Sequence, residues 1–303
     1  EQGEVLSNKY SNLETAVYEL TMGVSGLLKA SRCLVCDPTP DNEEYHAIMD
    51  QPLTPAEMED IVALYEGAIR VGDRSFGKWM DLLHASGALD NAVVVVIADH
   101  GEAFGEHRIR HHGFGLYEEL IHVPLMVRKY PAPAGSAGMA RVPHTVELID
   151  VFPTLVELAG IPFPERIQGR SLVGQILQPG VHGDSEQGLT AWSEVAPIFY
   201  ATLAGDKKYI YTDLSLQSLA RTSRAKWAAE CRSHSDRSPL YCEELYDLGS
   251  DPEEAVDLAR KAPDELRAAR ERMMLGWMEG TPGLRIVARA GARESAFLLR
   301  RTD

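Results

Sequence analysis

The sequence predicts an α/β protein with a mostly parallel sheet, followed by a smaller antiparallel sheet and a terminal helix. The first indication is Val93–Ala98, an apolar and mostly β-branched run that ends abruptly in polar residues. Such a run is typical of a strand buried on both faces of a sheet. A helical pattern precedes it, and helix and strand together form half of a parallel α/β unit. Beyond residue 188 the apolar periodicity shortens, which indicates strands joined by turns.

The helix before this strand has clear start and stop signals. Thr54 suits the N-cap, Pro55 suits the first helical position, and Glu57 completes a capping box. A stripe of apolar residues from Met58 to Leu83 is predicted to be buried, and Ser86-Gly87 ends the helix. A second helical pattern covers residues 144–160, with a new start or a kink at Pro153.

The C-terminal third contains strand patterns followed by one helix. We expect strands at Leu189–Ser193, Ile198–Leu203 and Lys208–Thr212, with a hairpin turn at Ala204–Lys207. Apolar residues from Leu266 to Trp277 recur at helical spacing and predict the terminal helix. Residues 179–188 are rich in turn formers and predict a boundary between subdomains. Near the N-terminus, Leu13, Val17, Leu20 and Val24 are spaced for another amphipathic helix.

The composition and charge of the chain argue against some classes of binding partner, namely nucleic acids and anionic membranes. The 303 residues are 45% hydrophobic and 25% charged, as is ordinary for a globular protein. The net charge of −15 repels nucleic acid phosphates and anionic membranes, so neither is expected as a partner. A small anionic substrate would need local positive charge, which a bound cation supplies. No apolar run has the length of a membrane span, no signal peptide is visible, and the first residue is Glu1 rather than Met.

Polar residues that follow the Val93–Ala98 strand are the best candidates for a functional site. Asp99 and His100 stand at its carboxyl end, where ligands gather in an open parallel sheet. A carboxylate beside an imidazole can hold a divalent cation, and Gly101 allows a tight turn. Four of the ten histidines lie between His100 and His112, which predicts a charged pocket.

The stretch from Asn91 to Val127 resembles the sulfatase family of the alkaline phosphatase superfamily. The resemblance rests on a strand ending in Asp-His-Gly-Glu and on three later motifs in the same order and at similar spacing. These motifs are Gly105-Glu106-His107, Leu116-Tyr117-Glu118-Glu119 and Val123-Pro124-Leu125. Weaker similarity extends it to roughly residues 54–258, including Gln168–Leu172 and Ser250–Glu254.

The resemblance implies an alkaline-phosphatase-like sandwich and two parts of the chain with different roles. Residues 1–180 would be part of the catalytic α/β domain, with the metal and sulfate or phosphate site, and residues 181–303 a smaller C-terminal subdomain. Asp99 and His100 would be metal ligands, and His112 would contact the sulfate or phosphate oxygens. The other nearby histidines, which are His107, His111 and His122, would play structural or supporting roles.

The family's nucleophile motif is missing from this sequence. That motif is Cys/Ser-x-Pro-x-Arg, and Cys36 is followed by Asp37-Pro38-Thr39-Pro40, so the arginine is absent. The family's upstream pair of acidic metal ligands is not visible either. Because ester cleavage needs a nucleophile in line with the leaving group, we expect this chain by itself to be inactive. It would be the C-terminal portion of a longer enzyme or a degenerate relative.

Several alternatives stay open on the sequence alone. Sulfatases typically use calcium, whereas an imidazole such as His100 suits manganese or zinc better. The first reading is a metal-dependent hydrolase of sulfate esters, and the second a phosphodiester or phosphonate ester hydrolase or a phosphoryl-group transferase. The third is a non-catalytic sulfatase-like binding domain. The resemblance favours an extracytoplasmic or periplasmic location. The pair Cys33-x-x-Cys36 is interpreted as incidental thiols or a structural disulfide, with half of a zinc site or a redox pair as the alternatives, and the sequence leaves the roles of Cys231 and Cys242 open.

Overall fold

The computed structural model describes residues 53–112, 115–131, 141–142, 144–163, 167–177, 190–195, 198–213, 241–280, 284–288 and 297–301. They belong to two compact units. The first unit comprises the described parts of Glu1–His112, His122–Pro143 and Leu148–Pro179. The second unit comprises those of Gly113–Ile121, His144–Glu147 and Gly180–Asp303. Two short segments ahead of residue 180 therefore group with the second unit.

Helix α4 of the first unit spans Pro55–Ala85 and starts as predicted. The Thr54 hydroxyl accepts the Glu57 N–H at 3.3 Å, and Glu57 Oε2 accepts the Thr54 N–H at 2.8 Å, which makes a capping box. The prediction that its whole apolar stripe is buried is wrong. Leu64 is buried, but Ile69 and Trp79 are 54% and 55% exposed, because few described residues pack against this face.

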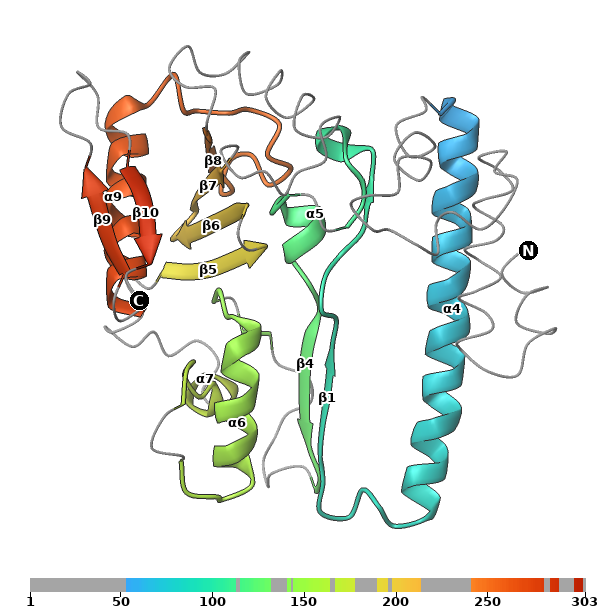
Figure 1. Cartoon of the computed structure of the whole chain (residues 1–303). Helices are drawn as coiled ribbons and strands as arrows, with labels where there is room; N and C mark the ends of the chain where they lie inside the picture. Colours follow the sequence, from blue (N-terminus) through green and yellow to red (C-terminus); the bar gives the residue numbers. More distant parts are fainter. Residues whose placement is uncertain are drawn as a thin grey trace. The chain divides into compact units, whose positions relative to one another are not determined.

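Strand β1 spans Val93–Ile97 and pairs antiparallel with β4, Leu125–Lys129 (Figure 1). The expected burial of β1 on both faces is wrong, since its valines are half-buried and Ile97 is 47% exposed. The reason is that, among the described strands, β4 is the only one paired with β1. All described strand pairs are antiparallel, so the parallel pairing expected for this sheet is not among them.

Three further helices of the first unit are held together by a buried carboxylate. They are η2 Leu148–Asp150, α6 Val151–Leu158 and α7 Val173–Leu177. Asp150 is 1% exposed, and its Oδ1 accepts the Arg170 N–H at 2.8 Å. The Thr154 hydroxyl donates to the Asp150 carbonyl at 2.6 Å and accepts the Leu172 N–H at 2.9 Å. The Gln168–Leu172 motif therefore supports the fold, as the sequence indicated.

A four-stranded antiparallel sheet forms the body of the second unit. Its strands, in sheet order, are β5 Thr190–Val195, β6 Phe199–Ala204, β7 Lys207–Asp213 and β8 Tyr241–Asp247. The three predicted strands are confirmed with small shifts at their ends. The predicted turn between β6 and β7 is also confirmed, and Gly205 adopts φ +58° there.

Helix α9, Pro263–Gly280, is the predicted terminal helix and packs on this sheet. Tyr209 and Leu245 from the sheet form a buried cluster with Met273 from the helix. A Cβ on Gly276 would lie 2.0 Å from Cζ2 of Trp192, so only glycine allows this close approach. Two further strands were not predicted and pair antiparallel with each other, namely β9 Leu284–Ala288 and β10 Phe297–Arg301.

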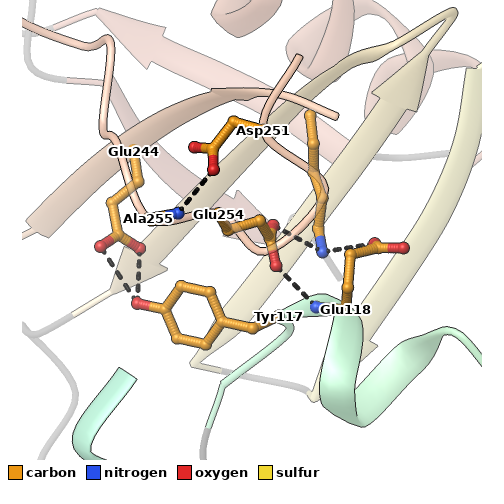
Figure 2. Close-up of polar contacts among 7 residues, drawn as sticks. Tyr117, Glu118, Glu244, Asp251, Glu254 and Ala255 are labelled. Atoms are coloured by element: carbon orange, nitrogen blue, oxygen red, sulfur yellow. Dashed lines mark hydrogen bonds and ion pairs between the residues drawn. The ribbon is translucent and has the colours of Figure 1, made fainter. Parts of the chain in front are cut away.

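A buried ionic network ties three segments of the second unit together. Lys208 on β7 is 0% exposed, and its Nζ lies 2.8 Å from Glu118 Oε1 and 2.8 Å from Glu254 Oε1. Figure 2 shows the Glu118 N–H, at the start of α5 (Glu118–Ile121), donating to Glu254 Oε2 at 2.6 Å. It also shows the Tyr117 hydroxyl donating to both carboxylate oxygens of Glu244, at 3.0 Å each. Burial raises the pKa of Glu254, while Lys208 and the Glu118 N–H oppose that rise.

Buried tyrosines should make the second unit sensitive to alkali. Burial is the largest contribution to the raised pKa of four tyrosines, which are Tyr117, Tyr209, Tyr211 and Tyr246. A tyrosine whose pKa in the folded state lies above its unfolded value of about 10 stabilises the fold fully below about pH 10. This stabilisation is lost as the pH rises above that value, because the unfolded chain then ionises more readily. We expect urea denaturation followed by near-UV circular dichroism to give a lower free energy of unfolding at about pH 11 than at about pH 8. Equal free energies at the two pH values would contradict the burial of these hydroxyls.

Some predictions fall outside the described residues. These are the helix from Leu13 to Val24, the boundary at residues 179–188, and the cysteines Cys33, Cys36 and Cys231. Among the residues that the structure does describe, no helix combines the length and the apolar character needed to cross a membrane.

Candidate metal and anion site

The end of β1 places Asp99 and His100 next to each other and open to solvent. Their side chains are 90% and 44% exposed, and His100 Nε2 lies 3.8 Å from Asp99 Oδ1. The same carboxylate oxygen accepts the His100 N–H at 3.0 Å. His100 Nδ1 lies 2.9 Å from the Gly101 carbonyl oxygen. If Nδ1 carries the proton, it donates to this carbonyl and leaves the Nε2 lone pair available to a cation.

A short hairpin brings His112 back to this place. Strands β2, Ala103–Phe104, and β3, Arg110–His111, pair antiparallel, with Ala103 opposite His111. The residues that flank this ladder therefore face each other, and His112 Nδ1 lies 3.1 Å from Glu102 Oε2. The rings of His100 and His112 stack, with their centroids 4.0 Å apart and their planes at 25°.

Electrostatics around His112 favour the cationic imidazole. The hydrogen bond to Glu102 raises the pKa of His112, partial burial lowers it, and the charges of Glu102 and Asp99 raise it further, with a net rise. A protonated imidazole carries two N–H donors. Because Glu102 accepts the hydrogen bond from Nδ1–H, the Nε2–H remains as a donor for an anionic oxygen. The His112 side chain is 48% exposed, so an anion from solvent can reach it.

The side chains at the end of β1 supply some, but not all, of the ligands that a divalent cation needs. A carboxylate oxygen and an imidazole nitrogen are common ligands of zinc and manganese, and the carboxylate also suits calcium. Within the described ranges no group of three or more His, Cys, Asp and Glu side chains is arranged to hold a metal ion. Asp99 and His100 can therefore occupy two positions of a coordination shell, and further ligands must complete it.

The structure brings together the three residues singled out in the sequence, Asp99, His100 and His112, and adds Glu102. Glu102 belongs to the Asp-His-Gly-Glu motif, but its pairing with His112 depends on the hairpin and could not be inferred from spacing. His107 lies at the hairpin tip with φ +46°. His111 lies on β3, and His122 is exposed after α5.

Cys242 on β8 is disulfide-bonded. It is the only cysteine among the described residues. The sequence left the role of Cys242 open, and the structure shows that it is a disulfide partner.

Comparison with family models gives two matches. The sulfatase model matches residues 31–161, which include Asp99, His100 and His112. A model for phosphoenolpyruvate carboxylase matches residues 1–59, most of which lie outside the described residues.

Curated relatives and solved structures agree with the first match. Arylsulfatase K of Homo sapiens is 29% identical over 212 residues, which cover 70% of this chain and 36% of the relative. The Xenopus laevis arylsulfatase K is 27% identical over 227 residues, or 73% of this chain and 38% of the relative. This chain thus spans little more than a third of the length of these relatives.

Two solved structures share the fold. A 2-O GAG sulfatase has a TM-score of 0.58 and 22% identity, covering 77% of this chain and 47% of that one. A phosphonate monoester hydrolase of Agrobacterium radiobacter has a TM-score of 0.55 and 20% identity, covering 77% of this chain and 45% of that one. Likenesses at this identity establish an alkaline-phosphatase-like fold.

Proposed function

We propose that this chain, which is similar to the sulfatase family over residues 31–161, supplies metal ligands and an anion contact to a hydrolase of sulfate esters. Asp99 and His100 would hold one divalent cation. His112 would donate from Nε2 to an oxygen of the sulfate group. The observation that carries this proposal is the convergence of the three side chains, with the two imidazole rings stacked at 4.0 Å.

The chemistry of sulfate ester cleavage explains why these groups belong together. When bound, a divalent cation polarises the ester and stabilises the negative charge that develops on its oxygens. His112, held by Glu102, is a fixed hydrogen-bond donor aimed by a contact of 3.1 Å, so it needs little reorganisation when an anion arrives. In a chain with a net charge of −15, this donor and the cation would provide the local attraction for an anionic ester.

Calorimetric titration with calcium, manganese and zinc tests the metal ligands. We expect Asp99→Asn and His100→Gln each to weaken binding of the preferred cation by at least about tenfold, because each removes or alters a ligand. Asp73→Asn is the matched control, since Asp73 is exposed on α4 and away from this motif in the sequence. An Asp99→Asn chain that binds every cation as tightly as the unaltered chain would remove the basis of the proposed metal site.

The identity of the preferred cation also separates two activities. We propose calcium first, as in sulfatases, with manganese or zinc as the alternative because His100 offers nitrogen. A preference for manganese or zinc would favour phosphodiester or phosphonate ester hydrolysis. The observation that supports this second candidate is the imidazole at the end of β1, together with the fold shared with a phosphonate monoester hydrolase.

A non-catalytic role is the third possibility and depends on the nucleophile. No Cys/Ser-x-Pro-x-Arg motif occurs in the sequence, so the groups described here would bind an anionic ester without attacking it. Sequencing of the complete gene distinguishes the cases, since an upstream Cys/Ser-x-Pro-x-Arg motif indicates a sulfatase and an unmodified Ser or Thr nucleophile indicates phosphoryl transfer. The absence of any nucleophile would favour a binding domain.

We also propose an extracytoplasmic location. The disulfide at Cys242 supports it, because disulfides form and persist in oxidising compartments such as the periplasm or the extracellular space.

A further inference from the structure

One side of helix α4 carries a regular stripe of residues. They recur at alternating spacings of four and three, and they are Tyr65, Ile69, Gly72, Phe76, Trp79 and Leu83. This alternation is the heptad pattern with which one helix packs along another. We call these six residues the α4 stripe.

The two ends of the α4 stripe differ in their surroundings. At its start, the Tyr65 ring meets the Phe104 ring edge to face, with the centroids 4.9 Å apart. Farther along, Ile69 is 54% exposed and Trp79 is 55% exposed, and Leu82 beside the stripe is 68% exposed. The stripe is therefore packed within the first unit at one end and open to solvent along the C-terminal half of the helix.

The exposed side chains form one surface. The rings of Phe76 and Trp79 are neighbours, with centroids 6.3 Å apart, and Ile69 lies two helical turns before Phe76 on the same side. Large apolar side chains that gather on one surface mark a site of interaction, whereas single exposed ones do not. The heptad spacing indicates that the occupant of this surface is a helix.

The same chain contains a segment with the matching pattern. Its apolar residues also alternate at spacings of four and three, and they are Leu13, Val17, Leu20, Val24 and Leu27. As a helix, 13–27 would be about 21 Å long, the same length as 69–83 of α4. Gly23 and Gly26 disfavour an isolated helix here, so the segment needs a packing partner to be helical.

This segment has no place in the similarity to known sulfatases. It lies outside the described residues, and it precedes residues 31–161, which match the sulfatase model. Residues 29–53 connect it to α4 and can extend over roughly 80 Å, whereas α4 itself is about 46 Å long. The connection is therefore long enough to let the segment reach any part of α4.

Charge favours the C-terminal half of α4 as the binding surface. The only charged residues of segment 13–28 are Glu14 and Glu19, both acidic. Residues 55–68 of α4 contain four acidic residues and no basic one, whereas residues 69–85 contain three Lys or Arg against two Asp. Because like charges repel, an acidic helix is accepted better along the second half, which is the half with the exposed stripe.

We propose that residues 13–28 form a helix that docks along the C-terminal half of α4 and covers Ile69, Phe76 and Trp79. The two heptad patterns would then bury each other's apolar side chains. The docked helix would close this side of the first unit and prevent other polypeptides from binding α4 there. The proposal is independent of the metal and anion site.

Hydrogen exchange of the full chain, followed by mass spectrometry of its peptides, tests this docking. In the unaltered chain the amides of residues 13–28 should exchange slowly. The rate should be equal at two protein concentrations tenfold apart, because the contact lies within one chain. Trp79→Glu places a charge in the apolar interface and should speed the exchange of these amides by at least about tenfold.

A matched control and a reciprocal variant accompany this measurement. Leu177 lies on α7 of the same unit and is 61% exposed, so Leu177→Glu should leave the exchange of residues 13–28 unchanged. Leu20→Glu alters the other partner and should speed exchange in residues 69–83 of α4. In each variant the amides of α6 should keep their rates, which distinguishes loss of docking from loss of folding.

Four outcomes would overturn the proposal. Residues 13–28 could exchange rapidly in the unaltered chain, or they could keep their slow exchange in Trp79→Glu while Leu20→Glu leaves α4 unchanged. Protection of 69–83 that rises with concentration, together with a dimer in sedimentation that Trp79→Glu dissociates, would assign the α4 stripe to a second copy of the chain. A monomer in which 69–83 exchanges rapidly would leave the stripe to a polypeptide outside this chain.

Discussion

Lys208→Met is expected to destabilise the second unit by about 3–5 kcal/mol, the range found when one partner of a buried ion pair is removed. Lys208 is 0% exposed and contacts both Glu118 and Glu254 at 2.8 Å. Methionine fills a similar volume but leaves the buried carboxylate of Glu254 without its cation. Urea denaturation followed by near-UV circular dichroism should show a lower transition midpoint, since Tyr117, Tyr209 and Tyr246 are buried in the same unit.

The neighbouring lysine provides the matched control. Lys207 also pairs with two carboxylates, Asp247 at 3.2 Å and Glu265 at 3.0 Å, but its side chain is 38% exposed. Ion pairs in contact with water contribute little to stability, so Lys207→Met should barely move the midpoint. Similar midpoints for the two variants would show that the network around Lys208 is not the buried ionic junction that the geometry describes.

Gly169→Ala is the second large effect, and we expect it to destabilise the first unit by at least about 3 kcal/mol, from left-handed backbone strain and overpacking together. Gly169 has φ +79°, and a Cβ there would lie 2.4 Å from the Ile149 carbonyl oxygen. That neighbour is backbone, so it cannot rotate away as a side chain could. Relief would have to displace Asp150, whose buried carboxylate accepts the Arg170 N–H.

A glycine-to-alanine substitution elsewhere in the first unit provides the control, because it shows the effect of replacing glycine where no close contact results. Gly72 lies inside α4, and nothing lies within 4 Å of a Cβ built on it. Gly72→Ala should therefore stabilise the chain by roughly 1 kcal/mol through helix propensity. Thermal unfolding that moves in the same direction for both variants would contradict the close contact at Gly169.

Local signals in the sequence were enough to predict several elements. Thr54, Pro55 and Glu57 fixed the start of α4, because a capping box depends on residues three apart. The turn at Gly205 was equally readable, since the strands on either side are adjacent in the chain. The position of Asp99 and His100 at the end of β1 was predictable for the same reason, because they directly follow a strongly apolar run, and their role as metal ligands stays a prediction.

Long-range contacts were beyond such reasoning. Lys208 and Glu254 meet across 46 positions of the sequence, and no periodicity marks a lysine in a strand as buried. The resemblance pointed to His112, but its hydrogen bond to Glu102 depends on how the β2–β3 hairpin closes. The prediction that β1 is buried on both faces was wrong, because an apolar pattern in a strand does not reveal how many elements cover the strand.

Anomalous diffraction from crystals soaked in manganese and sulfate tests most directly whether the end of β1 and the β2–β3 hairpin form one metal and anion site. We predict a manganese peak at bonding distance, about 2–2.5 Å, from the Asp99 carboxylate and His100 Nε2. A sulfate should lie beside His112. Manganese bound elsewhere, with Asp99 and His100 free of metal, or no bound manganese at all, would contradict this.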